Sequence, residues 1–352
     1  MTFEKLVPSF SLKKLPHSEV EFSGEIPADV LADYRERALA HIAGELELPG
    51  FRKGNVPLDI ALKKVGEMAV LEEAAELAVR DLYPDLVRHH KIDVVSRPDI
   101  RVTKLAPGNP LALTIRTAVY PEVDIPRDWK ALAQKIPLEA SAPATDEEVG
   151  KTLESLRQSR RAPGGEGTPG EEELPALDDE FAQTLGAFAD LADLKAKIRE
   201  GLSEEKKRAA RDKRRGDIID ALLKKTKADL PDVFVDSELE KILAQLKDDV
   251  ARFGRPFAEY LAKIGKTEEA LRAEFKEQAE KRARLQLALN ELAEREKIEA
   301  DEAAVDEEMK HALQHFPDAK PDLLRIHIAT VLRNERVLRA LEGSDGKIRR
   351  EG

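Results

Sequence analysis

The second half of the chain is a succession of long amphipathic segments. From Ala176 onward, apolar residues recur at intervals of three and four, which is the period of one face of an α-helix. Charged residues make up 36% of the chain and aromatic residues 5%, as is typical of helices with solvated faces. The pattern predicts an all-helical domain. The expected helices span residues 191–227, 231–253, 267–297, 301–315 and 321–341.

The first half changes period several times. Polar and apolar residues alternate over 17–25, which predicts a half-solvated strand, and a helical stripe follows through Leu46. A second helix is expected over 58–91. Alternation then returns between residues 92 and 123 and predicts antiparallel strands, with a hairpin turn at Gly108-Asn109-Pro110. This order of elements predicts a small α+β domain.

The two halves are joined by a helix and a Gly/Pro-rich stretch. Thr145 and Glu148 have the spacing of a capping box, which predicts a helix that ends before Pro163. Residues 163–170 hold four Gly and two Pro and indicate a linker. We therefore expect four consecutive segments. They are an α+β domain over 1–145, a connecting helix and linker over 146–175, a helical domain over 176–345 and a tail over 346–352.

Composition excludes several classes of function. The chain has no cysteine, so thiol catalysis and cysteine-based metal sites are excluded. Its net charge of -11 argues against a dedicated DNA-binding protein. Neither a signal-peptide stretch nor a membrane span is expected, which predicts a cytoplasmic protein. The His311/His315 pair is not accompanied by further metal ligands, and we find no phosphate loop and no catalytic constellation. The sequence thus predicts no metal, no cofactor and no catalytic residues.

One loop has the composition of a docking site. Residues 48–57 read LPGFRKGNVP, so that Gly and Pro frame one aromatic and two cationic side chains, Phe51, Arg52 and Lys53. A plain turn and a docking tip both fit this composition. Arg and Phe are anchor residues of interfaces, because a guanidinium pairs with carboxylate or phosphate and a ring fills a pocket.

Two further features leave alternatives open. The basic run between Lys206 and Arg215 fits either a solvated helix face or a docking surface for an anionic partner. The apolar stripes of the second half fit either a core or a shallow surface that binds unfolded chain. The candidate residues for such client binding are Leu239, Ile242, Leu246, Phe253, Phe257, Leu271 and Phe275.

At the 48–57 loop the sequence resembles bacterial trigger factor, a family of ribosome-associated chaperones. The similarity continues at residues 120–125 (YPEVDI), which resemble the end of the family's first domain. It resumes at 174–181 (LPALDDEF), which resemble the start of the family's helical domain, and runs on through 235–239 (VDSEL). Between residues 156 and 174, where the family carries a peptidyl-prolyl isomerase domain, this chain has too few residues to fold one.

The resemblance implies a mechanism with two sites. Gly50, Phe51, Arg52, Lys53 and Gly54 would dock on the large ribosomal subunit near the exit tunnel, where a ribosomal protein offers a carboxylate and ribosomal RNA offers phosphate. An elongated helical domain with arm-like projections would shield unfolded nascent chains through dispersed apolar contacts, without ATP. We also hypothesise weak homodimers of the free protein.

Rival interpretations belong to other classes. A prolyl isomerase would be an enzyme, and the missing domain argues against it. A helical scaffold or holdase that does not bind ribosomes would be indifferent to changes at Phe51 to Lys53. A periplasmic helical chaperone is disfavoured by the absence of a signal-peptide stretch.

Overall fold

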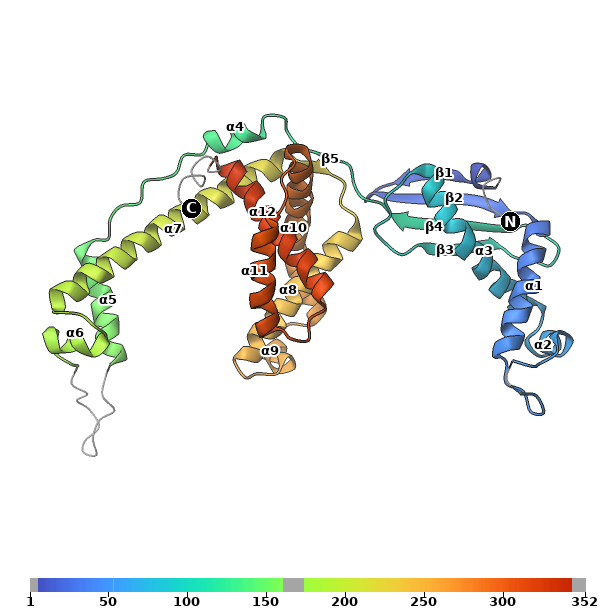
Figure 1. The fold of residues 1–352 in the computed structure, drawn as a ribbon, viewed down its shortest axis with the longest axis horizontal. Helices are drawn as coiled ribbons and strands as arrows, with labels where there is room; N and C mark the ends of the chain where they lie inside the picture. The colour runs from blue at the N-terminus through green and yellow to red at the C-terminus, as the bar shows by residue number, and fades with distance from the viewer. Residues whose placement is uncertain (1–5, 53, 161–173, 344–352) are drawn as a thin grey trace. The chain divides into compact units, whose positions relative to one another are not determined.

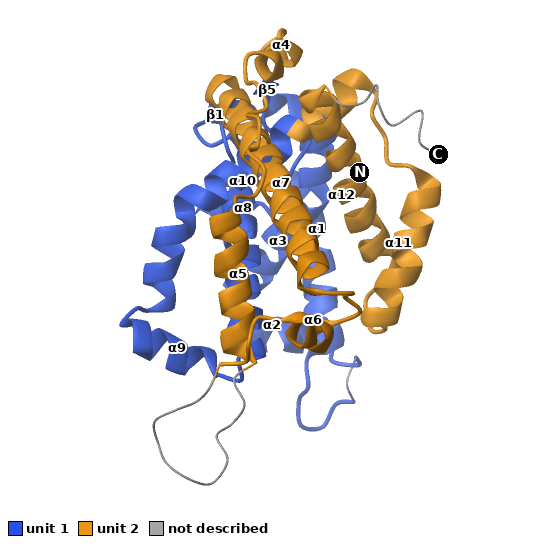
Figure 2. Ribbon diagram, turned by 90° about the vertical axis from the view of Figure 1, so that its left-hand side faces the viewer, with its two compact units in different colours: residues 1–124, 227–288 blue, residues 125–226, 289–352 orange. Residues whose placement is uncertain are grey.

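A computed structural model describes residues 6–52, 54–160 and 174–343. It forms two compact units, each built from two separate stretches of chain: Met1–Asp124 with Lys227–Ala288, and Ile125–Thr226 with Leu289–Gly352 (Figure 2). The consecutive boundaries at residues 145, 175 and 345 remain a prediction. The expected linker at 163–170 and the tail at 346–352 lie outside the described residues.

The first unit begins with a four-stranded antiparallel sheet in the order β1-β2-β4-β3. The helices α1 and α3 pack on one face of this sheet, and their apolar stripes share a core with Phe22, Leu113 and Ile115 (Figure 1). The elements are η2 (Val7–Ser9), β1 (Ser11–Leu15), β2 (Glu19–Ile26), α1 (Ala28–Glu45), α2 (Leu58–Val65), α3 (Glu67–His90), β3 (Asp99–Lys104), β4 (Leu111–Ala118) and β5 (Val123–Asp124).

The prediction of one helix over 58–91 is wrong. Two helices, α2 and α3, occupy this range and meet at Gly66, whose φ of 87° lies in the region that favours glycine. Pro84 lies inside α3, which continues past it to His90. The predicted hairpin is confirmed, since β3 and β4 pair antiparallel and Gly108 has a φ of 69°.

The first unit is completed by β6 (Lys227–Ala228), α8 (Asp232–Arg252), α9 (Phe257–Ile264) and the start of α10 (Glu268–Glu296). The expectation that the chain is entirely helical after Ala176 is wrong at one point, because β6 pairs antiparallel with β5. This pair lies beside a small core in which Leu230, Leu239 and Ala283 are buried. The pairing is favoured because Val123 and Ala228 pack against that core.

The second unit is helical. It contains α4 (Trp129–Gln134), α5 (Asp146–Ser159), α6 (Asp179–Leu185), α7 (Leu191–Lys225), the end of α10, α11 (Glu302–His315) and α12 (Pro321–Glu342). The predicted capping box opens α5, with the Glu148 amide donating to Thr145 Oγ1 at 3.3 Å and the Thr145 amide donating to Glu148 Oε2 at 2.8 Å. A core of Leu153, Phe181 and Leu194 joins α5, α6 and α7. The α+β first half and the helical second half agree with the fold class predicted from the sequence.

Candidate functional site

The loop at residues 48–57 connects α1 to α2 and is fixed at its base. The side chain of Val56 is buried in the core of the sheet domain, and Leu46 and Leu48 pack against the same core. Pro57 stands at the N-cap of α2. These anchors hold both ends of the loop while leaving its tip in solvent.

Two successive turns form the tip. The Phe51 amide donates to the Leu48 carbonyl at 3.1 Å, and the Asn55 amide donates to the Arg52 carbonyl at 3.0 Å. Gly50 and Gly54 have φ values of 89° and 83°, a backbone conformation that residues with a Cβ rarely adopt. The glycines at these two positions therefore determine the path of the loop, which explains their place in the motif.

The two described side chains at the tip, those of Phe51 and Arg52, are exposed. Phe51 is 39% exposed although it is a large aromatic residue, and Arg52 is exposed as well. Within the part of the chain that the structure describes, Arg52 forms no ion pair. Lys53 lies outside the described residues. An exposed ring beside an exposed guanidinium has the chemistry of an interface anchor, because both groups are available to a partner.

The client-binding candidates fall into three groups. Leu239, Ile242 and Leu271 are buried, and Phe275 packs partly buried against the core of Leu239 and Ile242, so these four hold the first unit together. Leu246 and Phe257 are half-buried. Phe253 is 84% exposed, immediately after α8.

The α8–α9 corner holds the exposed residue of that predicted set, Phe253. We define the corner by Phe253 and Phe257 from the set together with Tyr260 and Ile264, which the sequence analysis did not name. The rings of Phe257 and Tyr260 stack with centroids 6.0 Å apart, and Ile264 is 37% exposed. The corner presents apolar area that no described core covers, as Phe253 shows most clearly.

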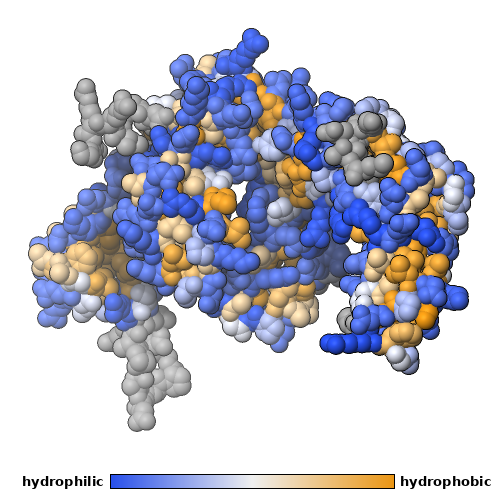
Figure 3. Space-filling model, turned by 45° about the vertical axis from the view of Figure 1, so that its right-hand side comes forward, coloured by the Kyte–Doolittle hydropathy of each residue, from blue (hydrophilic) through white to orange (hydrophobic). Residues whose placement is uncertain are grey.

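A second apolar surface was missed by the sequence analysis. We name it the α11–α12 face, and it consists of Phe316, Leu323, Ile326 and Val331. These side chains are 65%, 62%, 64% and 51% exposed. The spacing of Leu323 and Ile326 signals one helix face, but the same spacing marks buried stripes elsewhere, so only the structure separates them. Figure 3 shows that apolar residues gather in several separate patches on one side of the molecule.

The basic run on α7 is largely occupied within the second unit. Lys206 donates to Glu148 at 2.7 Å, Lys213 to Glu139 at 2.9 Å, and Arg215 to Glu335 at 2.9 Å. Arg214 donates to the backbone carbonyls of residues 133 and 136. These cations are therefore intramolecular ties, a role that neither sequence interpretation included.

Among the described residues, no group of three metal-ligating side chains comes together. No described helix is both long and apolar enough to cross a bilayer. The half-buried His90 has a pKa lowered first by desolvation and then by the neighbouring His89, and its ring centroid lies 5.5 Å from that of Phe22.

Comparison with known proteins identifies the family. A family model described as bacterial trigger factor protein matches residues 9–156, and a second, described as the C-terminus of the same protein, matches residues 190–338. The chain belongs to the trigger factor family. The two matches flank residues 157–189, which include the stretch between residues 156 and 174 where the sequence analysis expects no isomerase domain.

Curated relatives extend this result over most of the chain. A trigger factor of Agathobacter rectalis is 25% identical over 386 residues, covering 86% of this chain and 86% of that protein. A trigger factor of Frankia casuarinae is 26% identical, and the match covers 84% of this chain and 77% of that protein. The 386 aligned positions exceed the 352 residues of this chain, so the Agathobacter protein carries segments that this chain lacks.

The fold also has a solved counterpart. A structure from a study of promiscuous substrate recognition in folding and assembly activities of the trigger factor chaperone matches with a TM-score of 0.52 and 18% identity. The match covers 95% of this chain and 99% of that one. Membership in this family supports a chaperone role for the chain.

Proposed function

We propose that this chain docks on the large ribosomal subunit through the 48–57 loop and shields emerging polypeptides without ATP. The observation that carries the docking half is the exposed tip, where Phe51 is 39% exposed and Arg52 has no ion pair with a described residue. A guanidinium pairs with carboxylate or phosphate, and the ring fills a pocket. Ribosome docking also accounts for the cytoplasmic location expected from the sequence.

The shielding half rests on the two exposed apolar surfaces. The α8–α9 corner and the α11–α12 face leave large side chains in water, with Phe253 at 84% and Phe316 at 65% exposure. Apolar burial is non-directional, so separate small patches accept many client sequences with weak affinity. Client release follows when the client buries its own apolar groups.

We infer no isomerase activity. The matched regions leave residues 157–189 between them, and the Agathobacter alignment is longer than this chain. A proline-limited refolding reaction is expected to proceed at its spontaneous rate in the presence of the protein. Acceleration of that reaction would restore the enzyme interpretation.

Co-sedimentation with vacant bacterial ribosomes tests the docking half. The variant Phe51→Ala/Arg52→Ala/Lys53→Ala is expected to bind at least about tenfold more weakly, because anchor residues of interfaces contribute more than about 1.4 kcal/mol together. Raising the salt concentration is expected to weaken ribosome binding by the intact protein, since contacts of cations with RNA phosphate depend on salt.

The matched control is Leu58→Ala/Lys63→Ala/Lys64→Ala. It removes one exposed apolar residue and two exposed cations from α2, the helix next to the loop. This variant is expected to pellet with ribosomes like the intact protein. Equal pelleting of the loop variant and the intact protein would place the dock elsewhere, and no pelleting of either would favour a scaffold that does not bind ribosomes.

A further inference from the structure

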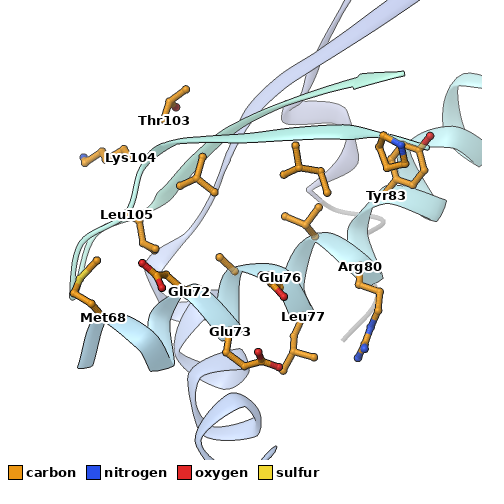
Figure 4. Close-up of a pocket in the computed structure, with 15 residues that line it drawn as sticks. Met68, Glu72, Glu73, Glu76, Leu77, Arg80, Tyr83, Thr103, Lys104 and Leu105 are labelled. Atoms are coloured by element: carbon orange, nitrogen blue, oxygen red, sulfur yellow. The ribbon is translucent and has the colours of Figure 1, made fainter. Parts of the chain in front are cut away.

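A groove lies between α3 and the edge strand β3 in the first unit, away from the 48–57 loop in sequence. Its cavity volume is about 920 Å³, at the upper end of the 300–1,000 Å³ that is common for ligand sites. Met68 and Leu77 line it from α3, and Ile100, Val102 and Leu105 line it from β3 and the residue after it. Figure 4 shows the space between the helix and the strand. We call it the α3–β3 groove.

The strand that borders the groove has one unpaired edge. The sheet order β1-β2-β4-β3 places β3 last, and among the described strands it pairs only with β4. All of its six residues are exposed. The backbone N–H and C=O groups on the outer side of such an edge are a template for a further strand. The register of β3 on β4 is regular over residues 99–102 and shifts between Val102 and Lys104. At about 3.3 Å per residue, the regular part offers about 13 Å of edge, the length of a four-residue extended segment.

The alternation along β3 turns its apolar side chains toward the groove. Ile100 and Val102 are two residues apart, so they lie on the same face of the sheet, and both line the cavity. They are 44% and 46% exposed, while Met68 across the groove is 47% exposed. A strand added beside β3 would place every second side chain over this apolar surface, which would become buried.

The charges around the groove select the partner. Glu72, Glu73 and Glu76 line the α3 side, and Glu73 lies 3.0 Å from the Nδ1 atom of His41. Figure 4 shows that the Lys104 and Arg80 side chains point away from the space, whereas the Glu72 carboxylate lies beside Leu105. The opening therefore presents carboxylates, and Glu72 and Glu76 form no ion pair with any described residue. A cationic partner complements them.

We propose that the α3–β3 groove binds an extended peptide segment by adding it as a strand to β3, with apolar and basic residues taking turns at every second position of the segment. Every second side chain points to the α3 face of the sheet, where the apolar ones enter the groove and the basic ones pair with Glu72 and Glu76. The peptide backbone bonds to the free edge of β3. This site uses none of the residues of the 48–57 loop, so peptide binding at the groove can be tested independently of ribosome docking.

Fluorescence anisotropy of the full chain with a labelled, capped Val-Thr-Lys-Thr-Val-Thr-Lys peptide, called the Lys-Val peptide, tests the site, because its valines and lysines lie on the same face of an extended strand. Binding is expected to saturate and to be lost with two altered peptides: one N-methylated at the amides that face β3, and one with serine in place of valine. Strand addition requires those amides, and groove filling requires the valines. Undiminished binding of the N-methylated peptide would overturn strand addition.

Charge reversal locates the site on the protein. Glu72→Lys/Glu76→Lys is expected to lower the affinity for the Lys-Val peptide at least about tenfold, because two charge-assisted contacts are replaced by repulsion. The matched control Asp33→Lys/Glu36→Lys makes the same change of charge at exposed positions on α1 and is expected to bind the peptide normally. Equal loss in both variants would show general attraction to an acidic protein and would refute the site.

Three further readouts separate the other outcomes. Hydrogen exchange at the amides of residues 99–104 is expected to slow on peptide binding, and unchanged exchange there would refute the proposal. Light scattering without peptide is expected to give the same mass for the intact protein and for Glu72→Lys/Glu76→Lys. A dimer that only the groove variant loses would make a second copy of the chain the occupant and would overturn the peptide assignment. Ribosome co-sedimentation of the groove variant is expected to be normal, so failure of this site and failure of docking are distinguishable.

Discussion

Replacement of Arg215 is expected to loosen α12 from α7 in the second unit. The Arg215 guanidinium donates to both carboxylate oxygens of Glu335, at 2.9 and 3.0 Å, and also pairs with Glu342. The hydrogen bond from Arg215 lowers the pKa of Glu335. The hydrogen bonds that Arg215 donates to Glu342 and Glu335 raise the pKa of Arg215. One cation thus joins two carboxylates of α12 to the middle of α7.

The magnitude follows from the burial of these groups. Removing one partner of a fully buried ion pair costs about 3–5 kcal/mol. The side chains of Arg215 and Glu335 are 32% and 33% exposed, so water screens part of the loss. Arg215→Met keeps most of the apolar stem. We expect a destabilisation of the second unit by about 2 kcal/mol, or about 30-fold in its unfolding equilibrium.

The same ion pairs set a pH dependence. The folded pKa of Glu335 is lowered, so its contribution to stability is present above the unfolded value of about 4.3 and is lost as the pH falls through the folded value. The difference between the intact protein and Arg215→Met is therefore expected to be full at pH 7 and to shrink below about pH 4, where the carboxylates become neutral.

Urea unfolding followed by hydrogen exchange at the amides of α12 measures this effect. Arg325→Met is the matched control, because Arg325 also joins two carboxylates, those of Glu302 and Asp306, but is 44% exposed. It is expected to cause a clearly smaller loss. Adding Glu335→Gln and Glu342→Gln to Arg215→Met is expected to recover part of the stability. Coincident unfolding of Arg215→Met and the intact protein at pH 7 would refute the reasoning.

Three further changes test other parts of the structure. Leu323→Ser/Ile326→Ser is expected to reduce the suppression of client aggregation while the unfolding midpoint stays unchanged, since both side chains are more than 60% exposed. A lowered unfolding midpoint would mean that these side chains belong to the core. A hydrogen bond from Lys206 helps lower the pKa of Glu148 to about 2. The Glu148 carboxylate is therefore expected to stay charged, and to keep stabilising the fold, as the pH falls from 4 toward 2. An NMR titration midpoint near 4.3 would contradict this. Phe22→Ala is expected to destabilise the first unit by about 3–5 kcal/mol in chemical unfolding, because its ring is fully buried; a loss below about 1 kcal/mol would contradict the placement.

Element type was predictable wherever a long segment kept one period. The helices α7, α8, α10, α11 and α12 each lie within two residues of their expected bounds. The break between α2 and α3 was not predicted, because the apolar stripe continues across Gly66. The β5–β6 pair was also missed. Each strand has two residues, too few to show a period, and their pairing depends on a core formed by distant helices.

The turn conformation of the 48–57 loop could be predicted because its signal is local, whereas its role as a docking site stays a prediction. Gly50 and Gly54 adopt the positive φ that only glycine adopts readily, and the Phe51 and Arg52 side chains are exposed. Exposure of the helical stripes could not be predicted in the same way. Ile242 on α8 and Ile326 on α12 occupy similar amphipathic stripes, yet one is 7% exposed and the other 64%. The difference lies in which other helix covers each stripe, and periodicity does not contain that information.

The central claim is that docking by the loop brings the shielding surfaces to the emerging chain. Cell-free translation of an aggregation-prone protein, with the chaperone titrated against ribosomes, tests it most directly. The account predicts that the intact protein keeps the product soluble when its concentration is near that of the ribosomes. The variant Phe51→Ala/Arg52→Ala/Lys53→Ala is expected to need an at least about tenfold higher concentration for the same effect, because docking raises the local concentration of the chaperone beside the emerging chain. Equal titration curves for the two proteins would contradict the claim.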